Sequence, residues 1–226
     1  MVPHVITTEL IAILPIYDKM GTDKKELSAM STTAAIRQYI KDHPDQIIDV
    51  AFLHKNFFPI VGKYTFLKTM TRIRDESLIK SVSHGVYAPA TIPEEKVPEA
   101  VLEYYAGHTH GMPHGDALYH ELGLIDQPPK EIKIYTNRLG NDKKRRVLNL
   151  ELIGANVIFD EAAKDLVTLL ELIEDRDYAI ALNSVKYAEI IEKLQKKDYS
   201  LALLKEIRES INYRSNTFTA LKKLLG

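Results

Sequence analysis

Apolar residues repeat every three to four positions in three short segments between residues 31 and 75, and this spacing predicts three amphipathic helices. The first helix begins at Ser31 or Thr32, whose hydroxyl groups suit a helix N-cap, and it ends before Pro44. The apolar positions of the three helices are Ala35, Ile36, Tyr39 and Ile40; Val50, Leu53 and Phe57; and Phe66, Met70 and Ile73. Residues 77–90, SLIKSVSHGVYAPA, then predict two strands joined by a tight turn at Ser83–His84–Gly85.

Three short helices followed by a β-hairpin is the element order of a winged helix-turn-helix domain, which we expect over residues 31–90. Residues 1–30 precede this domain as an N-terminal arm, in which Lys24–Met30 is a candidate short helix. Three prolines and a charged run in residues 89–98 predict a linker, which we place at residues 91–98. The remaining residues, 99–226, then form a second domain.

The second domain is predicted to be α+β, with a small antiparallel sheet and a helical tail. Two short helices, PEAVLEYYAG and GDALYHELGL, come first, and Gly123 ends the second of them. The predicted strands are Glu131–Thr136, Arg145–Ile153 and Asn156–Asp160, and the predicted tail helices are Asp160–Ile173, Ser184–Leu194, Leu201–Ile211 and Thr217–Leu225. Alternation along the second strand predicts that Leu148, Leu150 and Leu152 pack inward.

Composition narrows the class of protein. The chain has 226 residues, of which 45% are hydrophobic and 27% charged, as in ordinary globular proteins. No run of 18 apolar residues occurs, so no transmembrane helix is predicted. The N-terminus lacks the basic start of a signal peptide, and Pro15 interrupts its apolar stretch, so we expect a cytoplasmic protein. The absence of cysteine excludes disulfides, cysteine-ligated zinc and thiol catalysis.

The third helix carries the candidate DNA-binding face. Its positions away from the apolar stripe hold basic, hydroxyl and aromatic side chains, which suit phosphates and base edges. Residues 31–90 contain eight Lys or Arg and five Asp or Glu, a modest net charge of +3 in a chain whose net charge is −1. The predicted DNA-binding residues, including two on the hairpin, are Lys63, Tyr64, Thr65, Lys68, Thr71, Arg72, Lys80 and His84.

A second basic segment lies in NDKKRRV, residues 141–147. Lys143, Lys144, Arg145 and Arg146 follow a turn signal, so they are either a solvated hairpin tip or a contact for DNA phosphate or a protein partner.

Four histidines cluster at His108, His110, His114 and His120, which raises the question of a metal site. Gly111 and Pro113 disfavour a regular helix in HGMPH, so His110 and His114 are not expected to lie one turn apart on a helix. The His-Glu-x-x-His motif also fails, because Leu124 stands at its last position. We therefore assign these histidines a structural role, without a metal or cofactor. No Gly-x-Ser-x-Gly motif or phosphate-binding glycine loop is found, so we expect no enzyme activity.

The order of motifs resembles the AbiEi family, the antitoxins of type IV (abortive infection) toxin–antitoxin systems. The resemblance covers residues 32–226 and rests on Gly85-Val86-Tyr87 in the wing, on the helix from Ala117 to Leu122-Gly123-Leu124, and on Pro128 and the strand Ile132–Thr136 after it. It implies a transcriptional repressor that binds inverted repeats of operator DNA upstream of its own operon. It also implies that the second domain counteracts a nucleotidyltransferase-like toxin.

Two other readings of the sequence remain open. In the second, the winged helix and the C-terminal helices, residues 160–226, are a module that binds a protein partner rather than DNA. A histidine-metal enzyme is the third reading. The sequence does not decide between a monomer and a dimer, or between direct and indirect neutralisation of a toxin.

Overall fold

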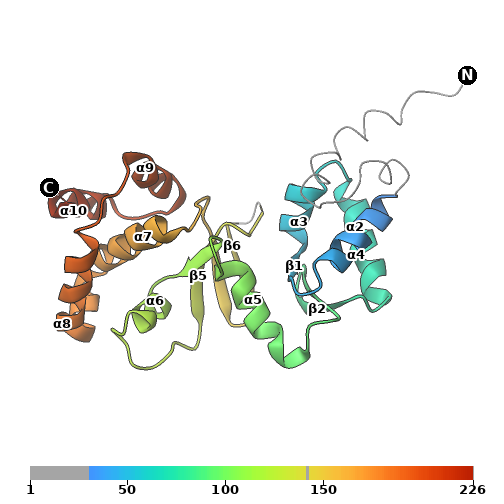
Figure 1. The fold of residues 1–226 in the computed structure, drawn as a ribbon, viewed down its shortest axis with the longest axis horizontal. Coiled ribbons are helices and arrows are strands. Elements are labelled where there is room, and N and C mark those ends of the chain that lie inside the picture. Colours follow the sequence, from blue (N-terminus) through green and yellow to red (C-terminus); the bar gives the residue numbers. More distant parts are fainter. Residues whose placement is uncertain (1–30, 141–142, 226) are drawn as a thin grey trace, which may run out of the picture. The chain divides into compact units, whose positions relative to one another are not determined.

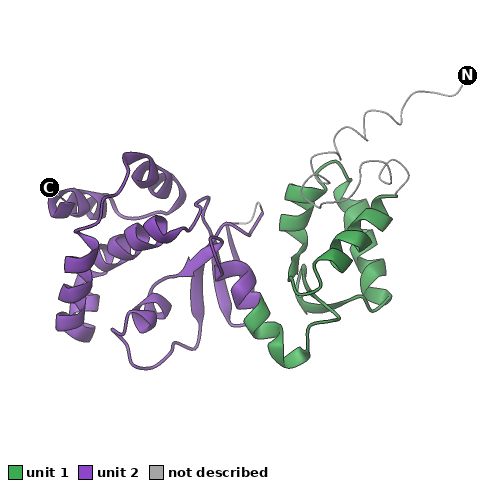
Figure 2. Cartoon of the chain, viewed as in Figure 1, with its two compact units in different colours: residues 1–100 green, residues 101–226 purple. Residues whose placement is uncertain are grey.

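The computed structural model describes residues 31–140 and 143–225, and Figure 1 labels its elements. The chain divides after Ala100 into two compact units, coloured separately in Figure 2, and each unit buries apolar side chains of its own. The described part is mixed α+β, which confirms the predicted fold class at that level. The predicted N-terminal arm, with its candidate helix at Lys24–Met30, lies outside the described residues.

The first unit has the predicted three helices followed by a hairpin. The helices are α2 (Thr32–Asp42), α3 (Val50–Phe57) and α4 (Lys63–Asp75), and the hairpin strands are β2 (Ile79–Ser83) and β3 (Val86–Pro89). The hydroxyl oxygen of Ser31 caps α2 by accepting the N–H of Ala34 at 3.3 Å, as the sequence predicted. The hairpin turns through Gly85, whose φ of 70° lies in the left-handed region that glycine adopts without a Cβ clash.

A strand that the sequence pattern did not reveal, β1 (Ile48–Asp49), completes a three-stranded antiparallel sheet in the order β1-β3-β2. Ile48 lies opposite Tyr87 in this sheet. Two residues are too few to show an alternating pattern, so the strand is recognisable only from its pairing. The side chain of Asp49 also caps α3, because it accepts the N–H of Phe52 at 3.1 Å.

The apolar stripe of α4 is the centre of the first unit's core. Phe66 and Ile73 are fully buried and Met70 is 1% exposed, and they pack in one cluster with residues of α2, α3 and β2. Burying three such side chains contributes several kcal/mol, at about 1.5–3 kcal/mol each. An ion pair between Arg37 of α2 and Glu76 joins the end of α4 to its neighbour. Burial of the apolar stripe fixes the rotation of α4 about its axis.

The predicted linker is structured. A short 3₁₀ helix, η2 (Glu94–Lys96), leads directly into α5 (Val97–Ala106), and the boundary between the units falls inside α5. Lys80 of β2 holds the segment before η2, because its ammonium donates to the carbonyl of Ile92 at 2.7 Å and pairs with Glu94 at 2.9 Å. α5 therefore begins one residue before the predicted helix PEAVLEYYAG, which starts at Pro98.

The sheet of the second unit is mixed, which corrects the predicted antiparallel sheet. Its strands are β4 (Gly111–Pro113), β5 (Ile132–Thr136), β6 (Lys144–Val147) and β7 (Leu150–Gly154), in the order β4-β5-β7-β6. β7 lies between β5 and β6, and it runs parallel to β5 and antiparallel to β6. β4 was not predicted, because three residues with a glycine and a proline resemble a loop.

The predicted strand Arg145–Ile153 is a hairpin of β6 and β7, in which Val147 lies opposite Leu150. Leu150 and Leu152 are buried as predicted, but Leu148 is 47% exposed, so its predicted inward packing was wrong. The turn at Leu148 interrupts the alternation, and its φ of 53° is a left-handed conformation that costs a leucine about 1–2 kcal/mol.

The predicted strand Asn156–Asp160 is irregular and pairs with no strand among the described residues. It still alternates, since Val157 and Phe159 are buried while Ile158 is 65% exposed. The carboxylate of Asp160 then caps the next helix by accepting the N–H of Ala163 at 2.8 Å. Alternating burial without a neighbouring strand explains why the pattern predicted a strand here.

Helices occupy the rest of the second unit (Figure 1). They are α6 (Asp116–Glu121), α7 (Glu161–Glu174), α8 (Arg176–Leu194), α9 (Leu201–Ser210) and α10 (Ser215–Leu225). Gly123 follows α6 at a φ of 71°, as expected of a helix-ending glycine. Asn183 has non-helical angles inside α8, and its side chain accepts the N–H of Lys186 at 3.0 Å, so a second helical segment begins where the sequence predicted one.

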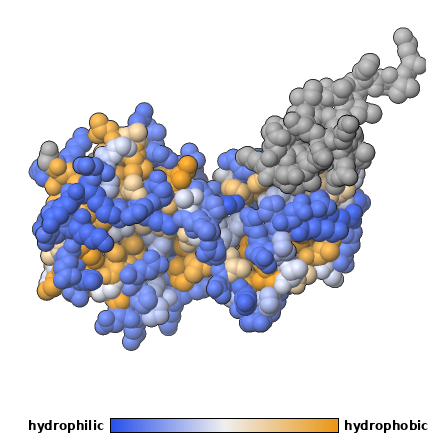
Figure 3. Space-filling model, viewed as in Figure 1, coloured by the Kyte–Doolittle hydropathy of each residue, from blue (hydrophilic) through white to orange (hydrophobic). Residues whose placement is uncertain are grey.

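Hydrophilic residues cover much of the face of each unit shown in Figure 3, with smaller hydrophobic areas between them. No helix in the described residues is long and apolar enough to cross a bilayer.

Candidate nucleic-acid interface

The outer face of α4 presents the side chains that the sequence predicted for DNA binding. Six polar or basic residues on this face are all exposed, and Tyr64 is 79% exposed. They are Lys63, Tyr64, Thr65, Lys68, Thr71 and Arg72. The same helix buries Phe66, Thr69, Met70 and Ile73 on its other face. The core of the unit therefore holds the six predicted residues toward solvent.

The cations on this face are not neutralised within the described part of the chain. Lys63, Lys68 and Arg72 make no ion pair with another described residue. Arg74, in contrast, is paired with Asp75 at 2.8 Å, and this carboxylate raises the pKa of Arg74. Three free cations on one helix therefore give this face a local positive charge that the overall charge of −1 conceals.

The N-terminus of α4 adds to this field. Gly62 is its N-cap and makes no side-chain capping bond, so the first N–H groups of the helix have no side-chain acceptor from the cap. Helix N-termini of this kind attract phosphate through these N–H groups and through the helix dipole. Lys63 stands at this end and supplies a charge beside them.

The two predicted hairpin residues have different environments. His84 is exposed at the hairpin turn, next to Gly85. Lys80 is only partly exposed, and its ammonium is engaged by Ile92 and Glu94. We expect His84 to be available for a phosphate contact and Lys80 to contribute little, because an engaged ammonium must first give up its partners.

Two of the four cations in the basic segment of the second unit pair with carboxylates. Lys144 pairs with Glu151, and Arg146 pairs with Glu131 at 2.9 Å. Arg145 donates to the hydroxyl of Tyr105 at 3.1 Å, and burial lowers its pKa. Lys143 is exposed. The run of four cations is therefore a weaker electrostatic patch than its sequence indicated, because Glu151 of β7 and Glu131, just before β5, lie against two of them.

The four clustered histidines do not converge. His108 is exposed, His110 contacts Arg138, and burial, with Arg138 next in importance, lowers the pKa of His110 to about 4. His114 stacks on Tyr135 with ring centroids 4.1 Å apart. No group of three or more His, Asp or Glu residues in the described ranges is arranged to hold a metal ion.

Sequence reasoning missed a buried polar cluster around Glu171. The residue is 5% exposed, and its carboxylate accepts hydrogen bonds from the hydroxyls of Tyr135 (3.1 Å) and Tyr213 (2.8 Å) and from the N–H of Gly115 (3.2 Å). Burial raises the pKa of this carboxyl despite the three donors. A glutamate within the leucine-rich stripe of α7 was the available signal. These bonds join α7 to β5 and to the chain before α10, so we interpret them as structural.

No protein-family model and no curated protein matches the chain.

Replacing His114 by Phe should flatten the dependence of stability on pH. Burial, followed by the charge of Lys133, lowers the pKa of His114 to about 4, so the unfolded chain binds this proton more readily than the folded protein does. The free energy of unfolding therefore falls as pH drops, by roughly 2 kcal/mol between pH 7 and pH 5 from this group. Urea unfolding at both pH values measures the difference.

His108→Asn serves as the control, because His108 is exposed and asparagine tolerates its left-handed φ of 49°. An unchanged pH dependence in the His114→Phe protein would show that burial does not depress this histidine's proton affinity.

Proposed function

We propose that the protein is a DNA-binding antitoxin and transcriptional autorepressor of a type IV toxin–antitoxin operon. In this proposal, residues 31–90 form a winged helix-turn-helix domain, and α4 is the helix that docks in the major groove. The observation that carries the proposal is the solvent face of α4, where Lys63, Lys68 and Arg72 stand exposed without an ion pair among the described residues.

The chemistry of this face supports DNA over other anionic partners. A major groove admits an α-helix, and residues at the helix start approach the base edges while cations contact the flanking phosphates. Thr65 and Tyr64 lie in the first turn of α4 and offer hydroxyls, and Lys68 and Arg72 follow one and two turns later on the same side. Side chains that could read bases thus stand beside side chains that bind phosphate.

The hairpin supports the same arrangement. β2 and β3 end in the exposed turn at His84 and Gly85, a protrusion suited to lie along the DNA backbone. Because Lys80 is tied to Glu94, we assign the contact to His84 and to the turn backbone, and give Lys80 a minor part.

The antitoxin part of the proposal concerns the second unit. Its support is the resemblance carried by the Leu122-Gly123-Leu124 turn and by the strand Ile132–Thr136, together with the second unit's own buried core. The neutralisation of Lys144 and Arg146 argues against the second unit as the main source of DNA affinity. We therefore propose that DNA binding belongs to the first unit and toxin neutralisation to the second, with no enzymatic step in either.

Replacing Lys68 or Arg72 by Ala should each weaken binding to the DNA upstream of the protein's own operon by about tenfold, the effect of losing one charged hydrogen bond. Each should also lower the slope of log K against log salt concentration by about one, since one phosphate contact is lost. Both side chains are exposed, so the thermal unfolding midpoint should stay unchanged. Fluorescence anisotropy at several salt concentrations measures both quantities.

Lys205→Ala is the matched control, because it removes one exposed cation from the second unit and leaves α4 intact. If the α4 variants bind like wild type, or if Lys205→Ala weakens binding equally, α4 is not the docking helix. Two exposed apolar residues, Ile60 just before α4 and Leu67 on it, would then favour a protein partner.

Because DNA binding is assigned to the first unit and neutralisation to the second, we expect repression and toxin neutralisation to be separable in cells. Full-length protein with Lys63, Lys68 and Arg72 all changed to Ala should still rescue growth from the nucleotidyltransferase-like toxin of its operon, but it should no longer repress a reporter driven by the operon promoter. Loss of rescue along with repression would contradict the assignment of neutralisation to the second unit.

A further inference from the structure

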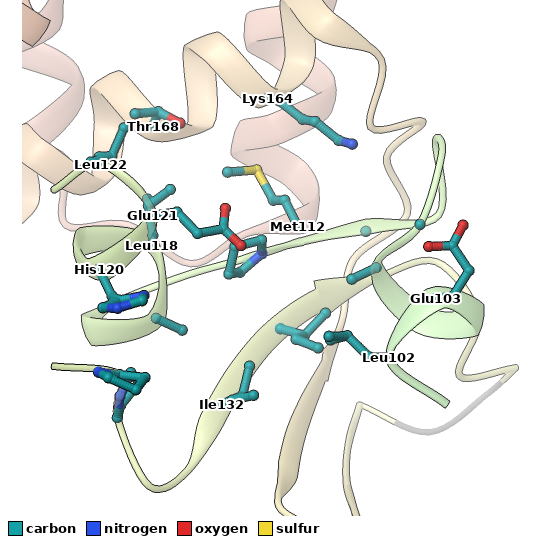
Figure 4. A pocket seen from close by; sticks show the side chains of 18 residues that line it. Leu102, Glu103, Met112, Leu118, His120, Glu121, Leu122, Ile132, Lys164 and Thr168 are labelled. Carbon is teal, nitrogen blue, oxygen red and sulfur yellow. The ribbon is translucent and has the colours of Figure 1, made fainter. Parts of the chain in front are cut away.

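The second unit contains a cavity of about 560 Å³ beside the short edge strand β4, shown in Figure 4. Five elements contribute its walls: α5, β4, α6, β5 and α7, together with the loop at Pro128 and Pro129. The volume lies within the range of about 300–1,000 Å³ that is typical of small-molecule sites. Neither the DNA-binding face nor the buried cluster around Glu171 uses this cavity.

The cavity walls are mainly apolar. Leu102 and Ala106 of α5 supply one side, and Ile132 and Ile134 of β5 supply another. Met112 of β4 also reaches into it, as Figure 4 shows. Several elements of one unit thus form a concave surface that suits an apolar body of the size of one or two fused rings.

The charged groups in the wall are not equivalent. Lys164 donates its ammonium to the carbonyl of His108 at 2.7 Å, and Glu103 lies 3.4 Å from the imidazole of the same residue. Glu121 is exposed, and it has no hydrogen-bond or ion-pair partner in the described part of the chain, although Lys164 is close enough for its charge to act on the carboxyl. Its side chain extends from α6 toward the cavity beside Met112 (Figure 4), where partial burial raises its pKa and the charge of Lys164 opposes that rise. The carboxyl group without an ion pair therefore lies at the solvent-accessible edge of an apolar wall.

A peptide strand fits this cavity poorly. β4 lies at the edge of its sheet, but it has three residues, and Pro113 has no N–H to donate to an added strand. Strand addition depends on a row of main-chain hydrogen bonds. The edge therefore favours a compact ligand over an extended peptide.

We propose that this cavity binds a small aromatic or alicyclic amine, with the ring against Met112, Ile132 and Leu102 and the protonated amine facing the carboxylate of Glu121. A ligand ammonium would give Glu121 the direct ion pair that it does not make with any described residue, and the ring would cover the apolar wall. This site is independent of the proposed DNA-binding function.

Tryptamine, indole and indole-3-propionate test the proposal, because they share one ring and differ in charge. The chain contains no tryptophan, so indole fluorescence can be excited selectively and its anisotropy followed on addition of protein. Tryptamine should bind about tenfold more tightly than indole, as expected for one charged contact, and indole-3-propionate should bind most weakly.

Two variants locate the site. Glu121→Gln should reduce the affinity for tryptamine to that for indole, whereas Glu103→Gln, which removes the carboxylate paired with His108, should leave it within about twofold. Ala106→Phe, which fills the cavity from the half-exposed face of α5, should abolish binding of all three compounds. Circular dichroism and the thermal midpoint establish that each variant is folded.

Equal affinities for the three compounds would overturn the proposal. So would undetectable binding of tryptamine to the wild-type protein at millimolar concentration, unchanged binding in the Glu121→Gln protein, or unchanged binding in a folded Ala106→Phe protein.

Discussion

Burial of one face of α4 is the constraint on which the proposed function depends. Phe66, Met70 and Ile73 are held in the core of the first unit, and rotation of α4 would bring them into water at about 1.5–3 kcal/mol each. The opposite face is consequently held in solvent. The side chains on that face, including Lys68 and Arg72, are thus presented by a rigid scaffold rather than by a mobile loop.

Pairing of charges then separates the basic residues of the chain into two kinds. Ion pairs with carboxylates partly neutralise the charge of four of them, namely Arg74, Lys80, Lys144 and Arg146. Lys63, Lys68 and Arg72 have none among the described residues. A net charge near zero therefore coexists with a concentrated positive face on one helix.

The sequence predicted helices better than strands, for a physical reason. The buried face of a helix such as α4 shows in the spacing of apolar residues within its own 13 residues. β1 and β4, in contrast, are defined by pairing with strands far away in the chain. Leu148 illustrates the same limit, because alternation continues across a turn that only pairing with β7 reveals. The exposed α4 residues followed from helical periodicity, but the partners of Lys80 and Lys144 did not, since they require tertiary structure.

The two units give the chain two separate sets of contacts. In the first, a small core supports a charged helix. In the second, α7 is buried along most of its length, and Glu171 joins it by hydrogen bonds to β5 and to the chain before α10. The second unit is thus built for packing and for its apolar cavity more than for electrostatic attraction.

The most direct test of the central claim is an anisotropy titration of the wild-type protein against its own upstream DNA and a scrambled duplex of equal length, at two salt concentrations. The account predicts tight binding that prefers the upstream DNA and weakens steeply with salt, because cations on α4 release counterions from phosphate. Equal affinity for the two duplexes at both salt concentrations would contradict it, and the helices and hairpin of the first unit would then be a scaffold for protein contacts.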